Sequence, residues 1–476
     1  MIDKKFTKDI FHVLLSNGVK LLLSIGSILV IPLIFSKQDY GFYKLFLLYM
    51  SYIGFFGLGF IDGIYLHYAG WEYEDLPKEK FVTFTKTLIL IQILISISFL
   101  VFGLFQVGDR KYILILSSIN SITLVLTGYY QIISQITKRF KEFAIVNITF
   151  SILTVLLIAI FYLFKIDNYI YFLIFTIFIN IVILLSYAIM YRNISIGYKI
   201  QINKFKEDIK KMFIMGIPLL LSNIVLILHS NIPRQLIEIK FPIEKFPEIF
   251  SDFSFAFTLI GFTSVFLTAF SVVFYPRLKA SSDVEISNTY INFDKIIIVI
   301  VSISLAAFFP LKIIINYLLP EYNNSVLLFF ILCPSIMFTS SVSVIKHNYY
   351  KKLNLSSRFL FIGIFFLIIL IGLFGYMVFF VTDSLIILTS IVVAVQLLWY
   401  IFLEFDIQRK LKIRSFKTTL YVLLSSLFFY LSYYFKLNIF SFLFYIVSLF
   451  LLITFVFRNE IFIMLKKIKK GDKRFD

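Results

Sequence analysis

Apolar runs of about 20 residues recur along the whole chain and leave little sequence between them. About 20 apolar residues are needed for a helix to cross the hydrocarbon core of a bilayer, so each run can form one transmembrane helix. The sequence therefore predicts an all-α polytopic membrane protein, because only helices and closed barrels satisfy their backbone groups in lipid. Fourteen helices are expected, at residues 12–35, 41–69, 82–106, 112–136, 143–164, 169–191, 212–234, 249–275, 296–319, 325–345, 359–381, 384–404, 418–435 and 438–457.

Composition supports the same class. Of the 476 residues, 60% are hydrophobic and only 15% are charged, and the mean hydropathy of +0.93 excludes a chain of soluble domains. The single cysteine, Cys333, excludes a disulfide framework, and the four histidines lack the paired spacings of metal ligands. No phosphate-binding loop of the GxxxxGK type is present, so ATP hydrolysis is not expected. We therefore predict a protein that is not an enzyme and uses no cofactor or metal.

The net charge of +18 is distributed along the chain rather than gathered on a polar domain, which argues against a nucleic-acid partner. With a cytoplasmic N-terminus, alternate loops place about 34 of the 45 Lys and Arg residues inside and about 10 outside, with Lys20 within a helix. Both termini are then cytoplasmic. The loop at residues 71–80 is the exception, since it is assigned to the inside but is net acidic.

Two sequence echoes indicate an internal repeat. Residues 220–223 (LLSN) repeat residues 14–17, and residues 344–351 resemble residues 134–141, with displacements of about 206 to 210 positions. This spacing predicts two lobes of six helices, related by a pseudo-twofold axis along the membrane normal. The predicted organisation is an N-lobe, a cytoplasmic linker, a C-lobe, and two extra helices with a basic tail, at residues 1–191, 192–211, 212–406 and 407–476.

Several short motifs resemble lipid-linked oligosaccharide flippases, the polysaccharide-export branch of the multidrug/oligosaccharidyl-lipid/polysaccharide (MOP) exporter superfamily. They are SKQDYGFY at 36–43, GLGFIDG at 57–63, GIP at 216–218, PR at 233–234, FYPRL at 274–278 and PEYNNS at 320–325. Together they span most of the chain. The family often has an acidic residue just before the arginine that closes helix seven, whereas Asn231 and Pro233 stand there in this sequence.

The resemblance implies a multi-pass protein of the bacterial inner membrane. It would move an undecaprenyl-diphosphate-linked oligosaccharide between leaflets by alternating access, for O-antigen (lipopolysaccharide), capsule or exopolysaccharide synthesis. Polysaccharide polymerase and chain-length regulator proteins are candidate partners besides the lipid-linked substrate and the bilayer. Two alternatives stay open: a cation-coupled multidrug exporter of the same superfamily, and a membrane oligosaccharide polymerase or ligase, although the short predicted outer loops argue against the enzyme.

Polar residues inside apolar runs are candidate substrate contacts, because such groups are costly in lipid unless they face protein, water or ligand. In the first helix these are Asn17 and Lys20, and in helix seven Asn223 and His229. Lys20 could meet a diphosphate, or it could pair with a neighbouring helix or reach the interface. His229 could titrate during transport, or it could form a hydrogen bond between helices.

Four further residues lie at or near helix ends. Arg234 suits bidentate phosphate binding but could also anchor the outer interface. Arg277 and Lys346 could receive the headgroup from the cytoplasm, although the inside excess of positive charge alone explains them. Asp62 lies among glycines and could carry a coupling ion, or it could be a helix-end group within a closely packed helix pair.

Overall fold

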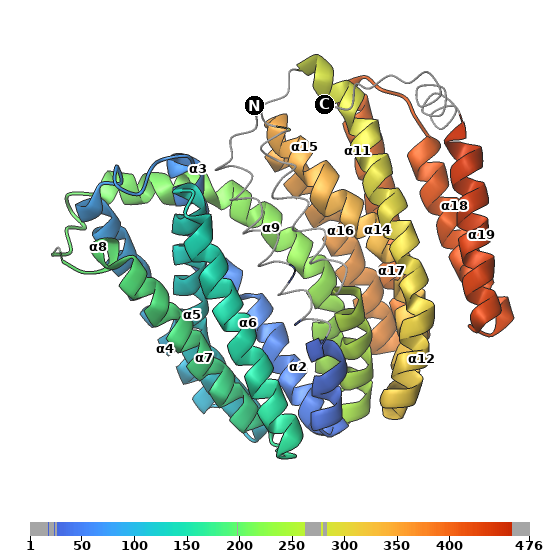
Figure 1. The fold of residues 1–476 in the computed structure, drawn as a ribbon, viewed down its shortest axis with the longest axis horizontal. Coiled ribbons are helices and arrows are strands. Elements are labelled where there is room, and N and C mark those ends of the chain that lie inside the picture. Colours follow the sequence, from blue (N-terminus) through green and yellow to red (C-terminus); the bar gives the residue numbers. More distant parts are fainter. Residues whose placement is uncertain are drawn as a thin grey trace. The chain divides into compact units, whose positions relative to one another are not determined.

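A computed structural model of the chain describes residues 18, 23, 26–197, 199–261, 278 and 283–458. All regular elements in these ranges are helical (Figure 1). Ten of the described helices are long and apolar enough to cross a membrane, or twelve if each of two bent pairs forms one span. The predicted all-α polytopic class is confirmed. The count of fourteen stays a prediction, because much of the expected first and eighth helices lies outside the described residues.

Packing divides the chain into two compact units, which we name unit 1 (Met1–Thr258) and unit 2 (Leu259–Asp476). Unit 1 contains a described helical segment at 26–34 and the start of a helix at 247. Its other elements are α2 (Lys37–Ser51), η1 (Ile53–Gly57), α3 (Phe60–Tyr68), α4 (Lys78–Leu104), α5 (Asp109–Ile136), α6 (Phe140–Leu163), α7 (Tyr169–Met190), α8 (Arg192–Ser195) and α9 (Lys206–Lys240). The predicted division into two six-helix lobes stays a prediction.

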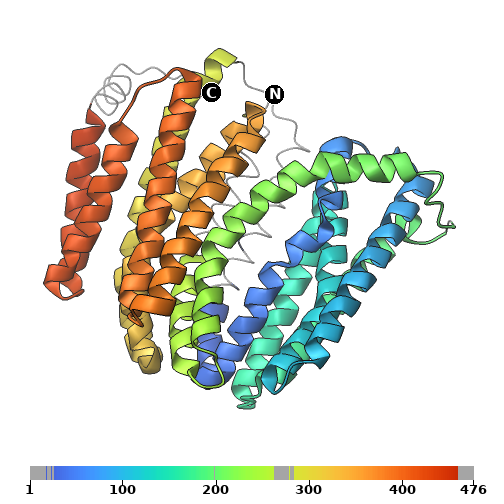
Figure 2. The same cartoon turned by 180° about the vertical axis from the view of Figure 1, so that it is seen from behind.

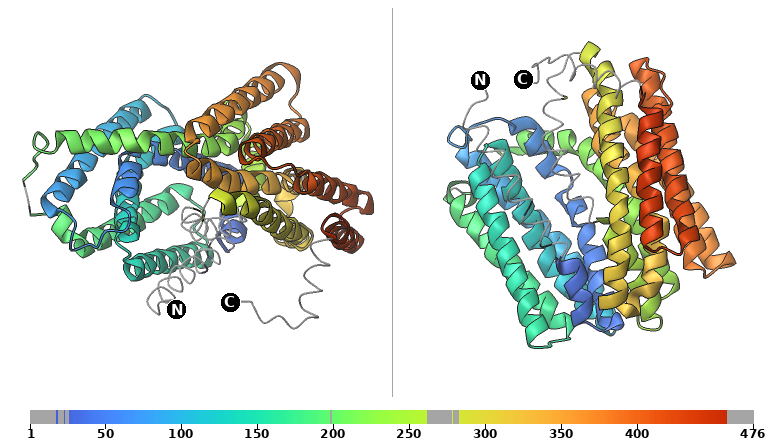
Figure 3. Two further views of the ribbon diagram at one scale, coloured as in Figure 1. Left: turned by 90° about the horizontal axis from the view of Figure 1, so that it is seen from above. Right: turned by 45° about the vertical axis from the view of Figure 1, so that its right-hand side comes forward.

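Unit 2 is also a helical bundle. Figure 3 shows its last two long helices, α18 and α19, side by side. Its elements are α11 (Asp283–Ser304), η2 (Leu305–Ala307), α12 (Phe308–Leu318), η3 (Pro320–Tyr322), α13 (Asn323–Leu332), α14 (Ser335–Ser340), the π-helical turn η4 (Ser341–Lys346), α15 (His347–Lys352), α16 (Ser356–Tyr376), the π-helical turn η5 (Met377–Val381), α17 (Leu385–Leu411), α18 (Lys417–Leu431), η6 (Ser432–Phe435) and α19 (Ile439–Val456).

Two of the expected helices are broken. The second bends by 56° between η1 and α3, where Leu58 and Gly59 adopt left-handed backbone angles, with φ of 49° and 80°. Glycine adopts this conformation without the steric cost of a side chain. The tenth bends by 55° between α13 and α14, at Pro334, whose ring removes a backbone donor. Each break therefore follows from a residue visible in the sequence.

Helix α9 runs through the segment that the sequence divides into linker and helix seven. It continues past Pro218 and Pro233 and curves along its length (Figure 2). Proline removes a backbone hydrogen bond inside a helix and favours such bending. The Ser222 hydroxyl donates to the Pro218 carbonyl oxygen at 2.9 Å.

Ion pairs connect the loops of unit 1 at its two ends. At one end the acidic loop at residues 71–80 binds basic residues of its neighbours, which accounts for its unusual charge. The ion pairs are Glu72 with Lys138 (3.5 Å), Glu74 with Arg139 (3.1 Å), Glu79 with Lys204 (2.8 Å) and Lys80 with Asp208 (2.9 Å). At the other end are Lys37 with Asp252 (3.2 Å) and Arg110 with both Glu238 and Glu244.

Two helices of unit 2 extend beyond their predicted apolar runs. Helix α11 begins at Asp283, although the run was expected from 296, and α17 ends at Leu411 rather than 404. The first extension carries Asp294, and Glu404 is the last residue of the predicted run in α17; both are at most 2% exposed. The helices continue because these polar side chains find partners inside unit 2.

Candidate functional site

A polar cavity of about 590 Å³ lies within unit 1, between η1, α3, α5 and α9. Its walls are mainly aliphatic, but four polar side chains reach it: Asp62, Gln131, Gln135 and Asn223. Amide and carboxylate groups of this kind can exchange hydrogen bonds with a hydroxylated ligand, since both groups accept hydrogen bonds and the amides also donate. The cavity therefore has the chemistry of a small polar binding site inside a membrane helix bundle.

A close contact between α3 and α9 shapes one wall of this cavity. A Cβ at Gly59 would lie 2.8 Å from the Ile217 nitrogen, and a Cβ at Gly63 or Gly216 would overlap the backbone of the facing helix. The glycines at 59, 63 and 216 are thus required for packing, as small residues often are between membrane helices. Asp62 lies between two of these glycines and lines the cavity.

Two cations lie within the helices of unit 1 without a carboxylate partner among the described residues. Lys44 of α2 is 6% exposed, and its ammonium lies 4.9 Å from the ring centre of Tyr40. Arg234 of α9 is close enough to Lys44 to repel it electrostatically. Its guanidinium donates to the Asn231 side chain, and its Nε has no described hydrogen-bond partner. We name these two residues the cation pair.

The cation pair lies away from the ends of α2 and α9. Lys44 is eight residues beyond Ser36, the N-cap of α2, which corresponds to about 12 Å along a helix. Asn231, the partner of Arg234, also donates to Ser51 Oγ at 2.5 Å and so ties α9 to the end of α2. An ionic ligand that reached this position would meet two preset positive charges.

Unit 2 holds a buried ionic cluster of a different kind, formed by Asp294, Lys346 and Glu404. The Lys346 ammonium is 2.6 Å from Glu404 Oε2, 3.4 Å from Asp294 Oδ1 and 2.6 Å from Ser341 Oγ. It also lies 4.4 Å from the ring centre of Tyr400. All three charged side chains are at most 2% exposed, so the cluster is screened from water.

A second ion pair lies near this cluster on α17. Asp406 accepts hydrogen bonds from Tyr350 at 2.6 Å and from Arg358 Nε at 2.8 Å. This Asp406–Arg358 pair contains one carboxylate and one guanidinium, so its formal charge is zero. The Asp294–Lys346–Glu404 cluster, in contrast, carries one excess negative charge if all its groups are ionised.

The structure brings together some of the predicted site residues. Asp62 and Asn223 line the same cavity, whereas Arg234 belongs to the cation pair and His229 is buried within α9. Lys346 is fully buried among carboxylates rather than presented at a helix end. Asn17, Lys20 and Arg277 lie outside the described residues, and their roles stay predictions.

Five polar residues of these sites are not predicted from the sequence: Lys44, Gln131, Gln135, Asp294 and Glu404. Lys44 falls in an expected helix but was counted only as a charge, while Gln131 was passed over as a neutral residue. Asp294 lies in an expected loop between two apolar runs, and Glu404 is the last residue of an expected helix. The missed signal was the position of a charge within a continuous helical pattern, because a charge in an apolar helix requires a partner or a ligand.

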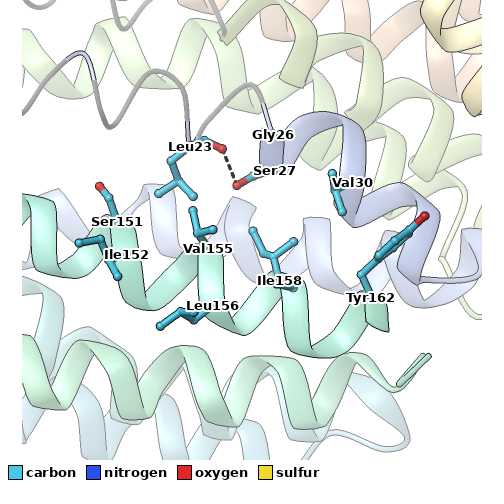
Figure 4. Close-up of a pocket in the computed structure, with 11 residues that line it drawn as sticks. Leu23, Gly26, Ser27, Val30, Ser151, Ile152, Val155, Leu156, Ile158 and Tyr162 are labelled. Carbon is cyan, nitrogen blue, oxygen red and sulfur yellow. Dashed lines mark hydrogen bonds between the residues drawn. The ribbon is translucent and has the colours of Figure 1, made fainter. Parts of the chain in front are cut away.

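A separate cavity of about 510 Å³ lies between the segment around residues 23–30 and α6 (Figure 4). Val155 and Ile158 of α6 face Leu23 and Ser27 across it, and the Ser27 hydroxyl donates to the Leu23 carbonyl at 2.8 Å. Among the described residues that line it, none is charged. Its walls suit hydrocarbon rather than a phosphate or a sugar.

Solved structures with the same fold were found by comparison. "Lipid II flippase MurJ, inward closed conformation" matches with a TM-score of 0.61 and 14% identity over 96% of this chain and 100% of that chain. The chain has the fold of MOP-superfamily transporters. An inward-facing multidrug resistance MATE family transporter of that superfamily matches with a TM-score of 0.62 and 13% identity, over 83% of this chain and 95% of its own.

A third match is a MOP superfamily transporter from Pyrococcus furiosus, described as having a binding pocket of reverse polarity. Its TM-score is 0.57 at 13% identity, over 86% of this chain and 96% of its own. No protein-family model matches the chain, and no curated protein sequence matches it. At these identities the likeness establishes the fold, and the substrate must be argued from the chain's own residues.

Proposed function

We propose that the protein is a flippase that moves an undecaprenyl-diphosphate-linked oligosaccharide across the bacterial inner membrane by alternating access. The observation that carries the proposal is the cation pair, because the buried Lys44 and the partly exposed Arg234 lie inside helices of unit 1 with no described carboxylate partner. Buried positive charges are costly unless a negative group compensates them during function. A diphosphate supplies two or more negative charges and suits the guanidinium of Arg234.

The polar cavity gives the same proposal a place for sugar. Asn223 lies eleven residues before Arg234 on α9, about 16 Å along the helix axis. A glycan attached to a diphosphate at the cation pair could reach the cavity and exchange hydrogen bonds with Gln131 and Asn223. The polyprenyl tail would stay in lipid, where it needs no polar partner.

The structural matches are consistent with this proposal. The matched lipid II flippase covers 96% of the chain, whereas the matched multidrug transporter covers 83%. The sequence predicts two helices after residue 406. These helices are described as α18 and α19. On this proposal both termini are cytoplasmic, and polymerase and chain-length regulator proteins act on the product.

The test is a leaflet assay in cells that lack the gene and carry plasmid-borne variants. Lys44→Gln and Arg234→Gln are expected to leave the lipid-linked unit in the cytoplasmic leaflet while its synthesis continues. Lys37→Gln is the matched control, because Lys37 lies on the same helix but already binds Asp252. Units that reach the outer leaflet without the gene, and only fail to polymerise, would instead favour the polymerase alternative.

One observation favours a second candidate, a cation-coupled multidrug exporter. Asp62 lines the cavity of unit 1, and a carboxylate there could attract an organic cation or carry a coupling ion. Under this alternative, Asp62→Asn abolishes export of lipophilic cations from cells, whereas Lys44→Gln does not. Loss of glycan transport in Lys44→Gln with unchanged drug tolerance would exclude it.

A further inference from the structure

The ionic cluster of unit 2 has a charge that its own residues do not balance. Asp294 and Glu404 bring two carboxylates, and Lys346 brings one ammonium. None of the three is more than 2% exposed, so water compensates little of the difference. An uncompensated charge in such a site costs several kcal/mol. Binding of one proton would remove it.

The hydrogen bonds indicate which carboxylate takes that proton. Glu404 accepts from three donors: Lys346 at 2.6 Å, Tyr290 at 2.7 Å and Gln408 at 2.6 Å. Such donors stabilise the ionised form of a carboxylate. Asp294 accepts from the Ser341 hydroxyl through Oδ1, whereas Lys346 at 3.5 Å is the only donor to its Oδ2 among the described residues. Asp294 Oδ2 is therefore the oxygen with room for a proton.

The position of Lys346 argues for a proton rather than a metal ion. Its ammonium lies between the two carboxylates, where a bound cation would otherwise sit. No group of three or more His, Cys, Asp or Glu suited to a metal occurs in the described ranges. A proton needs no coordination sphere and fits on a carboxylate oxygen beside the lysine.

We propose that the Asp294–Lys346–Glu404 cluster is an exchangeable proton site, with the proton held on Asp294 Oδ2. Binding forms one O–H bond, converts the Asp294 carboxylate to a carboxylic acid, and changes the formal charge of the cluster from −1 to 0. No electron is transferred and no bond other than O–H forms or breaks. The site stands independently of the proposed cargo, whereas its use to drive transport would rest on the proposed function.

A polar connection leads from the cluster toward the loop after α17. The Gln408 side chain donates to Glu404 and to the Ser415 carbonyl at 2.7 Å, and it accepts from the Ser415 N–H at 2.9 Å. Ser415 is partly exposed, so water can approach one end of this connection. The other wall of the cluster is the π-helical turn Ser341–Lys346, and such turns are frequent at functional sites.

Other titratable groups surround the cluster on the elements packed against it. Tyr290 lies on α11, Tyr349 on α15 and Tyr400 on α17, and their hydroxyls stay neutral across the range in which carboxylates titrate. Lys295 follows Asp294 on α11. Other charged or titratable groups on the packed elements include His347, Tyr350, Lys351, Lys352, Arg358 and Asp406. Asp406 is already bound by Arg358 and Tyr350, so it is the matched comparison for Asp294.

The test is an infrared pH titration of the purified full-length protein in nanodiscs, which detects the carbonyl band of protonated carboxyl groups. The wild-type protein is expected to show a band from one buried carboxyl that disappears as the pH rises. Asp294→Asn removes this band, and Asp406→Asn keeps it. A band that persists undiminished in Asp294→Asn, or a wild-type protein without any titrating band, overturns the proposal.

Ser341→Ala provides a second variant with a small change in volume. It removes the hydroxyl that donates to ionised Asp294, so protonation is expected to occur at a pH roughly one unit higher. An unchanged midpoint would contradict the assignment to Asp294. Replacing K⁺ by Na⁺ at constant ionic strength is expected to leave the wild-type band unchanged, and a band abolished by Na⁺ would mean a metal-ion site instead.

Discussion

In unit 1, helices α4, α5 and α7, which are the third, fourth and sixth expected helices, meet around hydroxyl groups. Their predicted counterparts in unit 2 meet around charges. In unit 1, Thr85 donates to the Ile194 carbonyl at 2.9 Å, and the Ser134 and Tyr191 hydroxyls are 2.9 Å apart. In unit 2, the predicted counterparts of these helices meet at the cluster of Asp294, Lys346 and Glu404. Neutral hydroxyls bury cheaply once they are hydrogen-bonded, while charges need a complete set of partners.

The two units also differ in whether the cations inside them have carboxylate partners. The cation pair of unit 1 has none among the described residues, whereas Lys346 in unit 2 has two. A buried cation with carboxylate partners contributes to the integrity of a unit, and a cation pair without a described carboxylate partner is a place for an anionic ligand. The difference suggests that unit 1 contacts an anionic substrate and that unit 2 responds to protons. Mutations that act differently on stability and transport test this division.

The largest effect is expected from Gly216→Val in unit 1. Side-chain atoms there would overlap the Gly59 backbone and separate α3 from α9, destabilising the fold by about 3 kcal/mol or more. The measurement is the yield of monodisperse protein and its thermal unfolding in detergent. Gly128→Ala is the control, because a Cβ at Gly128 meets open space. Equal effects of both substitutions would refute the close contact.

Lys346→Met tests the charged centre of unit 2. It leaves Asp294 and Glu404 buried without their cation, which is expected to destabilise the protein by about 3–5 kcal/mol. Adding Glu404→Gln to this variant should recover part of the loss, since it removes one of the two carboxylates. A double-mutant cycle by thermal unfolding measures the coupling. Additive effects would mean that the two side chains do not interact.

Lys44→Met in unit 1 is expected to act in the opposite direction on stability. The substitution removes a buried charge that has no described carboxylate partner, so stability should stay the same or rise by about 1 kcal/mol. Transport in the leaflet assay should nevertheless fall strongly. This combination separates a ligand contact from a structural group. Destabilisation as large as that of Lys346→Met would show that Lys44 has a structural partner.

Much of the fold could be predicted from the apolar runs and from the glycine and proline residues that interrupt helices. Gly59 and Pro334 lie at the two bends, and the loop with Glu72 and Glu74 lies beside basic loops, as the topology required. The bends depend on single residues, and the pairing of the loops follows because successive loops alternate between the two sides of the membrane. The left-handed angle at Leu58 depends on its neighbour Gly59 and was not expected.

The candidate sites were less accessible from the sequence. Asp62 and Asn223 were selected separately, and only the packing of α3 on α9 places both on one cavity. Asp294 was missed because hydropathy ends a helix where polar residues begin, although the helix continues when those residues find partners in space. Pairing across 52 residues, as between Asp294 and Lys346, has no signal in a single sequence.

The smallest expected effect concerns salt. At about 1 M salt the Debye length falls to about 3 Å, which weakens exposed ion pairs but not buried ones. The pairs that bind the loop at 71–80 in unit 1 are exposed, whereas the cluster of unit 2 is buried. High salt should therefore increase tryptic cleavage at Lys78 and Lys80 and leave the carboxyl titration of unit 2 unchanged. Glu72→Gln with Glu74→Gln should reproduce the cleavage at low salt. If salt shifts the titration as much as the cleavage, the cluster is open to solvent, and the contrast between the two units would not hold.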